Sequence, residues 1–249
     1  VFGKLTGHIS FAGENSPESL KALICNYLDI EYKNEIEDIE VDVPARPPIL
    51  CGGCPHRGSF FAIKEAMKDR KAVFTGDIGC YTLGNAKPLE MVDTCLCMGA
   101  GVTIAQGIKR AENDFINFAF IGDSTFFHSG ITGVINAIYN ETDMILVVLD
   151  NGTTAMTGKQ PHPGTGLTMM QQSHSSIKIP ELLKGLGIKE VSVLNPFELK
   201  NSIEEIKRIA DLDGIRAIIF QYPCIKLYKK EKVYRVIEEK CIYCKKCVN

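Results

Sequence analysis

The sequence predicts an α/β protein built on a doubly wound, mostly parallel sheet of about six strands. Two apolar runs, Ile116 to Ile121 and Met144 to Leu149, each end in polar turn residues and are typical of buried strands. Between them, hydrophobic residues recur at roughly helical spacing from Phe127 to Tyr139. This helix and a six-residue strand would each be about 20 Å long, so the helix returns the chain to begin a parallel neighbour in a right-handed crossover.

The first 46 residues are expected to form a helical appendage ahead of the main domain. Ser16 followed by Pro17 is a favourable helix start, with Ser as N-cap and Pro in the first position, and the helix is predicted to run to about Leu28. Residues 29–42 are acid-rich and indicate a solvated linker. Three prolines at residues 44–48 then stiffen the start of the main domain.

Strand and helix patterns alternate along the main domain, residues 47–228, as in a doubly wound sheet. The remaining predicted elements are a helix from Ser59 to Lys68, a strand from Ala72 to Thr75, a helix starting near Met98, a helix from Pro180 to Leu186, a strand from Lys189 to Leu194, a helix capped at Asn195 and ending at Ala210, and a strand from Arg216 to Tyr222.

The composition is typical of one sizeable α/β domain with short appendages. The chain has 249 residues, 45% of them hydrophobic, and a mean hydropathy of +0.01. A net charge of −2 gives no reason to expect nucleic acid or an anionic membrane as a partner. There is no apolar run near the ~20 residues of a membrane helix and no signal-peptide pattern, so we expect a cytoplasmic protein. A first residue other than Met suggests a fragment of a longer chain.

Asp123 and Asn151 directly follow the two central strand patterns. Parallel strands bring their carboxyl ends to one edge of the sheet, where open α/β sheets bind ligands. One carboxylate, one amide oxygen and a nearby backbone carbonyl suit Mg²⁺, which takes its other ligands from water and phosphates. The alternative is two ordinary turn residues, but the paired spacing favours the metal.

The motif Gly-Asp-Ser at residues 122–124, followed after twenty-five residues by Asp-Asn at 150–151, resembles the thiamine-diphosphate-binding motif. That motif is Gly-Asp-Gly and then Asn-Asn, so one Gly is replaced by Ser here and one Asn by Asp. The resemblance implies that Asp123, the Asn151 side chain and the Thr153 carbonyl bind Mg²⁺, which holds the diphosphate of thiamine diphosphate.

The longer stretches 122–130 and 150–164 are similar to the large (α) subunit of indolepyruvate ferredoxin oxidoreductases, members of the 2-oxoacid:ferredoxin oxidoreductases. The resemblance covers roughly Arg46 to Cys224 and implies a thiamine-diphosphate-binding fold for residues 47–228. It makes residues 1–46 the tail of a preceding domain and a linker. The cofactor-binding residues that it implies are His56, Gly79, Gly99, Gly122, Asp123, Ser124, Asn151, Thr153, Met156 and Thr157.

Four of the ten cysteines are expected near the cofactor. Cys80 and Cys224 each follow a predicted strand, and Cys51 and Cys54 open the main domain. Clustered CxxC spacings favour metal or iron–sulfur ligation in a reducing compartment over disulfides. The resemblance implies that these four hold a [4Fe–4S] cluster close to thiamine, although Pro55 stands where the wider family has Gly. The alternative is free, partly buried thiols.

Three further cysteines, Cys241, Cys244 and Cys247, lie at the end of the chain. Their spacing matches the first three ligands of a bacterial ferredoxin motif, whose fourth would fall past the last residue. We therefore expect residues 229–249 to be the truncated start of a [4Fe–4S] ferredoxin-type segment. A zinc site is the alternative, and the CxxCxxC spacing favours iron–sulfur over it.

Three histidines are candidate catalytic residues. His56 and His162 lie in glycine- and proline-rich stretches near the expected cofactor, and His128 closely follows Asp123. Histidine in such a place can hydrogen-bond a diphosphate or transfer a proton near neutral pH. Each is equally well explained as a residue that fixes its loop.

The resemblance implies an enzyme that oxidatively decarboxylates arylpyruvates such as indolepyruvate with CoA, giving aryl-acetyl-CoA, CO₂ and reduced ferredoxin. The glutamate that activates thiamine and a smaller β subunit would be supplied from outside this chain, so the fragment alone is expected to be inactive. Two other hypotheses stay open. A non-oxidative thiamine-dependent decarboxylase or synthase leaves the terminal cysteines without a role, and a non-enzymatic iron–sulfur electron-transfer module leaves Asp123 and Asn151 without one.

Overall fold

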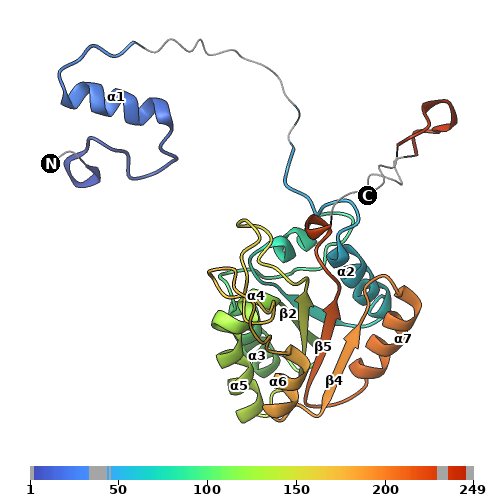
Figure 1. Cartoon of the computed structure of the whole chain (residues 1–249). Coiled ribbons are helices and arrows are strands. Elements are labelled where there is room, and N and C mark those ends of the chain that lie inside the picture. Colours follow the sequence, from blue (N-terminus) through green and yellow to red (C-terminus); the bar gives the residue numbers. More distant parts are fainter. Residues whose placement is uncertain (1–2, 34–43, 45, 229–234, 245–249) are drawn as a thin grey trace. The chain divides into compact units, whose positions relative to one another are not determined.

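The structure, a computed structural model, divides into two compact units, Val1–Pro47 and Pro48–Asn249 (Figure 1). It describes residues 3–33, 44, 46–228 and 235–244. The smaller unit contains helix α1 (Pro17–Tyr27). Its N-cap Ser16 accepts a hydrogen bond from the backbone N–H of Ser19 at 3.2 Å, so the predicted helix start is confirmed.

The larger unit is built on one parallel sheet with the strand order β1-β2-β3-β5-β4. Among the described residues the sheet has five strands, compared with the prediction of about six, and every strand named from the sequence is present. Each neighbouring pair is parallel, so all carboxyl ends meet at one edge. The strands are β1 (Ala72–Thr75), β2 (Ile116–Gly122), β3 (Met144–Asp150), β4 (Glu190–Leu194) and β5 (Ile215–Gln221).

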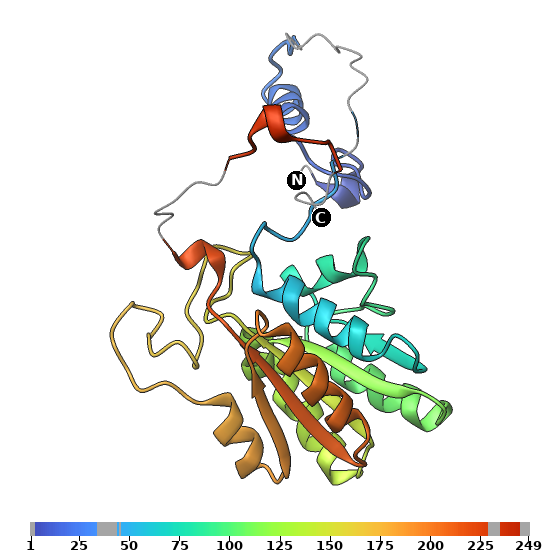
Figure 2. The same ribbon diagram turned by 90° about the vertical axis from the view of Figure 1, so that its right-hand side faces the viewer.

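Helices cover both faces of this sheet, as a doubly wound fold requires (Figures 1 and 2). Helices α2 (Pro55–Ala66) and α7 (Leu199–Ala210) pack on one face. The other face is covered by α3 (Ala100–Ala111), α5 (Ile131–Tyr139) and α6 (Ile179–Gly185). The predicted α/β class is therefore confirmed.

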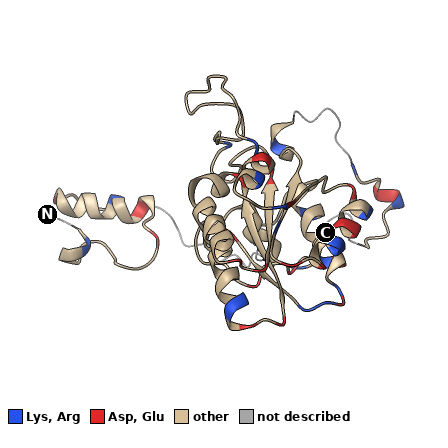
Figure 3. Cartoon of the chain, turned by 90° about the horizontal axis from the view of Figure 1, so that it is seen from below, with Lys and Arg blue, Asp and Glu red and all other residues tan. Residues whose placement is uncertain are grey.

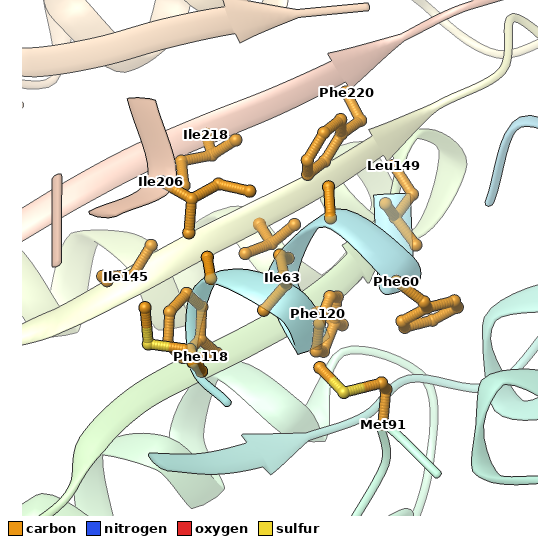
Figure 4. Close-up of a cluster of buried hydrophobic side chains, with 14 of the residues drawn as sticks. Phe60, Ile63, Met91, Phe118, Phe120, Ile145, Leu149, Ile206, Ile218 and Phe220 are labelled. Atoms are coloured by element: carbon orange, nitrogen blue, oxygen red, sulfur yellow. The ribbon is translucent and has the colours of Figure 1, made fainter. Parts of the chain in front are cut away.

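The core consists of two layers, one on each face of the sheet. Along β2, Phe118 and Phe120 point to the α2 and α7 side, where the Phe120 ring lies 4.8 Å from that of Phe60 (Figure 4). Ala119 and Ile121 alternate with them and point to the α3 and α5 side. A fully buried side chain of the size of Phe or Ile stabilises the fold by about 1.5–3 kcal/mol through apolar burial. Because both faces are buried, the strands are apolar along their middle and carry charges near their ends (Figure 3).

The helix that follows β2 begins earlier than the sequence predicts and contains an irregular turn. Helix α4 (Asp123–Thr125) starts at the first residue after the strand, a π-helical turn (Phe126–Gly130) follows, and α5 continues from there. Such turns inside helices often occur at functional sites. Asp123 is therefore held at the junction of a strand and a helix, where its backbone is fixed from both sides.

Two helix starts differ from the predictions for local reasons. Helix α2 begins at Pro55 rather than Ser59, because Pro is favoured in the first helical position and Cys54 is already extended. The prediction of a cap at Asn195 is wrong, since α7 begins at Leu199 with Glu198 before it. The Asn195 side chain instead accepts a hydrogen bond from the backbone N–H of Phe197 and forms a turn.

Within the part of the chain that the structure describes, no helix combines the length and hydrophobicity that a membrane span requires.

Candidate functional site

Asp123 joins the loops that follow β2 and β3. Its side chain is fully buried. Oδ2 accepts hydrogen bonds from the backbone N–H groups of Asn151 at 3.1 Å and Gly152 at 2.9 Å, and Oδ1 accepts one from Ser124 at 2.7 Å. The parallel register, in which Gly122 lies opposite Leu149, brings these loops together. The two motif residues that lie far apart in the sequence are thus neighbours in the fold.

Asn151 is buried and held through both its side chain and its main chain. Its Oδ1 accepts a hydrogen bond from the backbone N–H of Thr153 at 3.1 Å, and its Nδ2 lies 3.1 Å from Nε2 of His56. Its backbone carbonyl accepts a hydrogen bond from the N–H of Cys224 at 2.9 Å. One lone pair of Oδ1 remains available to a cation.

The donor set at this edge fits Mg²⁺. Among the described residues, no three His, Cys, Asp or Glu side chains gather closely enough to hold a single metal ion. A metal here would therefore be held by mixed oxygen ligands: the carboxylate of Asp123, the amide oxygen of Asn151 and the carbonyl of Thr153, the last of these also buried. Hard oxygen donors with few protein ligands are the arrangement that Mg²⁺ uses when it binds phosphates.

His162 packs against Asp123 from the loop that follows β3. Its Nε2 lies 3.1 Å from Oδ2 of Asp123, but this contact lacks the alignment of a hydrogen bond. Nδ1 accepts a hydrogen bond from the backbone N–H of Gly164 at 3.2 Å, and the ring stacks on Phe127 with 5.8 Å between centroids. His162 thus ties the loop to the proposed metal ligand.

His56, the second residue of α2, is buried beside Asn151. Burial lowers its pKa to about 4, partly opposed by the negative charge of Asp123. The ring is therefore neutral at physiological pH, and it contacts Tyr81 with 5.1 Å between ring centroids. A neutral imidazole at this place acts as a hydrogen-bonding group rather than as a cation.

Two residues that the sequence analysis missed, Asp77 and Tyr81, also shape the site. The fully buried Asp77 accepts hydrogen bonds from the backbone N–H groups of Gly99 at 2.9 Å and Gly122 at 3.2 Å. Tyr81 packs over Gly122 so closely that a Cβ there would lie 2.0 Å from its hydroxyl oxygen. Burial, then the charges of Asp123 and Asp77, raise the pKa of Tyr81. Asp77 follows the end of β1 as Asp123 follows β2, so the same sequence signal would have found it.

A cavity of about 90 Å³ lies next to these residues. Its walls come from the loops after β1, β2 and β3, and they include six of the residues predicted to bind the cofactor or its cluster. Those six are Gly79, Cys80, Ser124, Asn151, Met156 and Thr157.

Four thiols, here called the cysteine quartet (Cys51, Cys54, Cys80 and Cys224), interact electrostatically with one another. The pKa of Cys54 is raised to about 11, mainly by burial and in smaller part by the neighbouring thiols of the quartet, while the nearby backbone N–H of His56 opposes the rise. Burial also raises the pKa of Cys80, with further contributions from Cys224 and Cys51.

The quartet fits a [4Fe–4S] cluster better than it fits a single ion. The thiols interact as charges, yet within the described residues they do not gather closely enough to hold one metal ion. A cluster is larger than an ion and is held by four cysteine thiolates. Its iron would also supply the positive charge that thiolates at this buried place lack.

Comparison with known proteins identifies the family of the chain. Residues 77–219 match the model of the thiamine pyrophosphate enzyme, C-terminal TPP binding domain. The chain is 39% identical to the indolepyruvate oxidoreductase subunit IorA of Archaeoglobus fulgidus, over 100% of this chain and 42% of that protein. It is 41% identical to the IorA subunit of Thermococcus kodakarensis, over 90% of this chain and 37% of that protein.

The chain belongs to the IorA family. It spans about two fifths of the length of these curated relatives. A solved structure, 2-oxoglutarate:ferredoxin oxidoreductase from Magnetococcus marinus, shares the fold with a TM-score of 0.63. That likeness covers 80% of this chain and 72% of the solved chain at 20% sequence identity, and so concerns the fold alone.

The predicted residues of this IorA family member fall into three groups. Asp123, Asn151, Thr153 and two of the three histidines, His56 and His162, are joined by direct contacts. Cys224 contacts the carbonyl of Asn151, and Asn151 and Cys80 line the cavity. His128 lies exposed on the π-helical turn, and no contact in the described part of the chain joins it to Asp123 or Asn151. Cys241 and Cys244 are free thiols, and Cys247 lies outside the described residues.

Proposed function

We propose that this chain is the thiamine-diphosphate- and Mg²⁺-binding part of a ferredoxin-dependent oxidoreductase that oxidatively decarboxylates arylpyruvates. Indolepyruvate or a related arylpyruvate would be the substrate, CoA the acyl acceptor and ferredoxin the electron acceptor. The observation that carries the proposal is the meeting of Asp123 and Asn151 with the cysteine quartet at one edge of the sheet. The printed names of the IorA relatives support the choice of substrate.

The oxygen ligands would position the cofactor. Bound thiamine diphosphate supplies a carbon nucleophile for the 2-oxo group and an electron sink after loss of CO₂. Asp123, the amide of Asn151 and the carbonyl of Thr153 would hold Mg²⁺ and, through it, the diphosphate. Tyr81 lines the cavity and packs over Gly122, and His162 packs against the buried carboxylate of Asp123.

The cysteine quartet would hold the [4Fe–4S] cluster whose iron would accept the electrons. Oxidation of the substrate releases two electrons, CO₂ and an acyl group, and the acyl group passes to the thiol of CoA. A [4Fe–4S] cluster carries one electron at a time, so two ferredoxins are reduced in turn. The backbone N–H of His56, which lowers the pKa of Cys54, is a group of the kind that tunes such a cluster.

The chain alone would not complete the reaction. We propose that residues 1–46 are the tail of a preceding domain with an acidic linker, residues 47–228 the diphosphate-binding domain, and residues 229–249 the start of a ferredoxin-type segment. The activating glutamate and a smaller β subunit would come from outside this chain. Thiolate-held clusters require a reducing compartment, which supports a cytoplasmic location.

The test is anaerobic reconstitution of the complete large subunit with its small subunit, followed by iron, magnesium and thiamine analysis. Acceptor reduction is then measured with indolepyruvate, phenylpyruvate, pyruvate and 2-oxoglutarate in the presence of CoA. We expect CoA-dependent reduction that is fastest with the two arylpyruvates. Cys80→Ser should lose iron and acceptor reduction, while Cys25→Ser, on α1 of the smaller unit, should keep both.

Three outcomes would contradict parts of the proposal. Arylpyruvates no better than pyruvate would overturn the substrate. An iron-free but thiamine-loaded enzyme would favour a non-oxidative decarboxylase. Acceptor reduction without any 2-oxoacid would favour an electron-transfer module.

A further inference from the structure

His56 contacts both halves of the site at once. It stands two residues after Cys54, a member of the cysteine quartet, and its backbone N–H is near enough to lower the pKa of that thiol. Its side-chain Nε2 lies 3.1 Å from Nδ2 of Asn151, a proposed metal ligand. The side chain is only 3% exposed, so bulk water does not replace either contact. One residue therefore lies between the thiols and the amide.

The amide of Asn151 has one orientation that suits its neighbours. Oδ1 accepts from the backbone N–H of Thr153, and Nδ2 donates to the unprotonated Nε2 of His56. After a flip, Oδ1 would face the lone pair of His56 and Nδ2 would face the N–H of Thr153. The acceptor on His56 thus keeps the amide oxygen, rather than the amide nitrogen, available to a cation.

A second connection reaches Asn151 from the other end of the chain. The backbone N–H of Cys224 donates to the carbonyl of Asn151 at 2.9 Å. The side chain and the main chain of Asn151 are therefore each held by a segment that carries a quartet cysteine. The contact with Cys224 holds the backbone of Asn151, whereas the contact with His56 sets the orientation of its side-chain amide.

We propose that His56 is a positioning residue that couples occupancy of the cysteine quartet to binding of Mg²⁺ and thiamine diphosphate at Asp123 and Asn151. The proposal rests on the proposed function and adds a regulation to it. With empty cysteines, the segment that carries His56 is less constrained, the Asn151 amide is less well oriented, and the diphosphate binds more weakly. Because linkage is reciprocal, thiamine diphosphate stabilises the filled cysteine site by the same factor.

The test measures binding rather than turnover. The complete enzyme that contains this chain is prepared anaerobically with and without its iron–sulfur clusters, and its affinity for thiamine diphosphate with Mg²⁺ is measured by calorimetry. His56→Leu removes the acceptor, and His56→Gln keeps one at similar reach. His174→Gln is the matched control, because His174 is exposed and its side chain hydrogen-bonds only its neighbour Ser175 among the described residues.

We expect the wild-type enzyme to bind at least about fivefold more tightly when the clusters are present. His56→Leu should bind about tenfold more weakly than wild type, equivalent to about 1.4 kcal/mol, and should lose the dependence on the clusters. His56→Gln should restore most of the affinity and of the dependence. His174→Gln should behave as wild type.

Wild-type affinity in His56→Leu, or a cluster dependence that persists in it, overturns the proposal. If circular dichroism shows that His56→Leu is unfolded, His56→Asn, too short to reach Asn151, replaces it in the same comparison. A wild-type enzyme that binds no thiamine diphosphate in either state refutes the proposed function. Binding that is equally tight with and without clusters refutes the coupling alone.

Discussion

Two groups of charged residues lie at opposite ends of the same sheet. Only one of them is neutralised by ion pairs within the protein. At the amino ends of the strands, Asp143 forms ion pairs with Arg216 of β5 and, at 3.0 Å, with Lys109 of α3. At the carboxyl ends, Asp77 and Asp123 are fully buried, and among the described residues neither pairs with a Lys or Arg. The first group is neutralised within the protein, whereas the second is not.

The pKa values of the carboxylates differ between the two groups in the same sense. Although desolvation, the largest influence, raises the pKa of Asp143, Lys109 and Arg216 outweigh it and the net shift is downward. Burial raises the pKa of Asp150, and the neighbouring Asp123 raises it further. The unpaired carboxylates at the carboxyl ends of the strands support the proposed cation site, because perturbed titratable groups cluster at functional sites.

The largest expected effect comes from neutralising one carboxylate in each group. Asp123→Asn should weaken Mg²⁺-dependent binding of thiamine diphosphate by roughly 100-fold, about 2.7 kcal/mol, because the proposed metal loses its charged protein ligand. Asp143→Asn should leave that binding unchanged. Calorimetry on the complete enzyme measures both. Equal losses of thiamine diphosphate affinity in Asp123→Asn and Asp143→Asn would contradict the distinction between the two charged groups.

The second effect concerns the close packing at the carboxyl edge. Gly122→Ala places a Cβ 2.0 Å from the hydroxyl of Tyr81, so the ring must move and the free energy of unfolding should fall by about 3 kcal/mol. Gly107→Ala in α3 is the control, because its Cβ meets nothing within 4 Å, and it should stabilise by up to about 1 kcal/mol. Urea denaturation followed by circular dichroism gives both values. Similar free energies of unfolding for Gly122→Ala and Gly107→Ala would show that the Tyr81 ring moves aside at little cost.

The third effect concerns the contribution of the ion pairs around Asp143 to stability. Arg216→Met removes the buried partner of Asp143 and should cost about 2 kcal/mol of stability without changing cofactor binding. Arg208→Met removes exposed ion pairs with Glu190 and Glu205 and should cost less than about 1 kcal/mol. Denaturant titration of both variants checks the order. A cofactor-binding defect in Arg216→Met would contradict the assignment of this cluster to stability alone.

The smallest effect is a pH dependence at the quartet in the cluster-free chain. The folded pKa of Cys54, about 11, lies above the ordinary thiol value of 9.0, so the thiol keeps its proton to higher pH in the folded state than in the unfolded state. The stabilisation that this pKa difference gives to the folded state is complete below the unfolded pKa and is lost as the pH rises through the folded pKa. Between pH 9 and about pH 10 the free energy of unfolding should therefore fall by about 1 kcal/mol. Cys54→Ala should show a flatter slope, and an identical slope would exclude this thiol as the cause.

The strands and the position of the proposed metal ligands were predictable because both follow from local rules. A strand that is buried on both faces must be apolar, and polar residues then appear where it ends, as at Asp123 and Asn151. The histidines show where such rules stop. His128, close to Asp123 in sequence, is carried to an exposed turn, while His162 returns to contact Asp123 from a much later loop.

The sequence by itself determined the order of the elements, the apolar strands and the family, because hydrophobic spacing and motif residues are local properties. The tertiary structure alone decided that β5 lies between β3 and β4, and thereby that Cys224 reaches Asn151. It also decided that His56 bridges Asn151 and Cys54 and that Tyr81 covers Gly122. These contacts join residues from separate strand ends, and strand order results from how helices pack on both faces of the sheet rather than from any one segment.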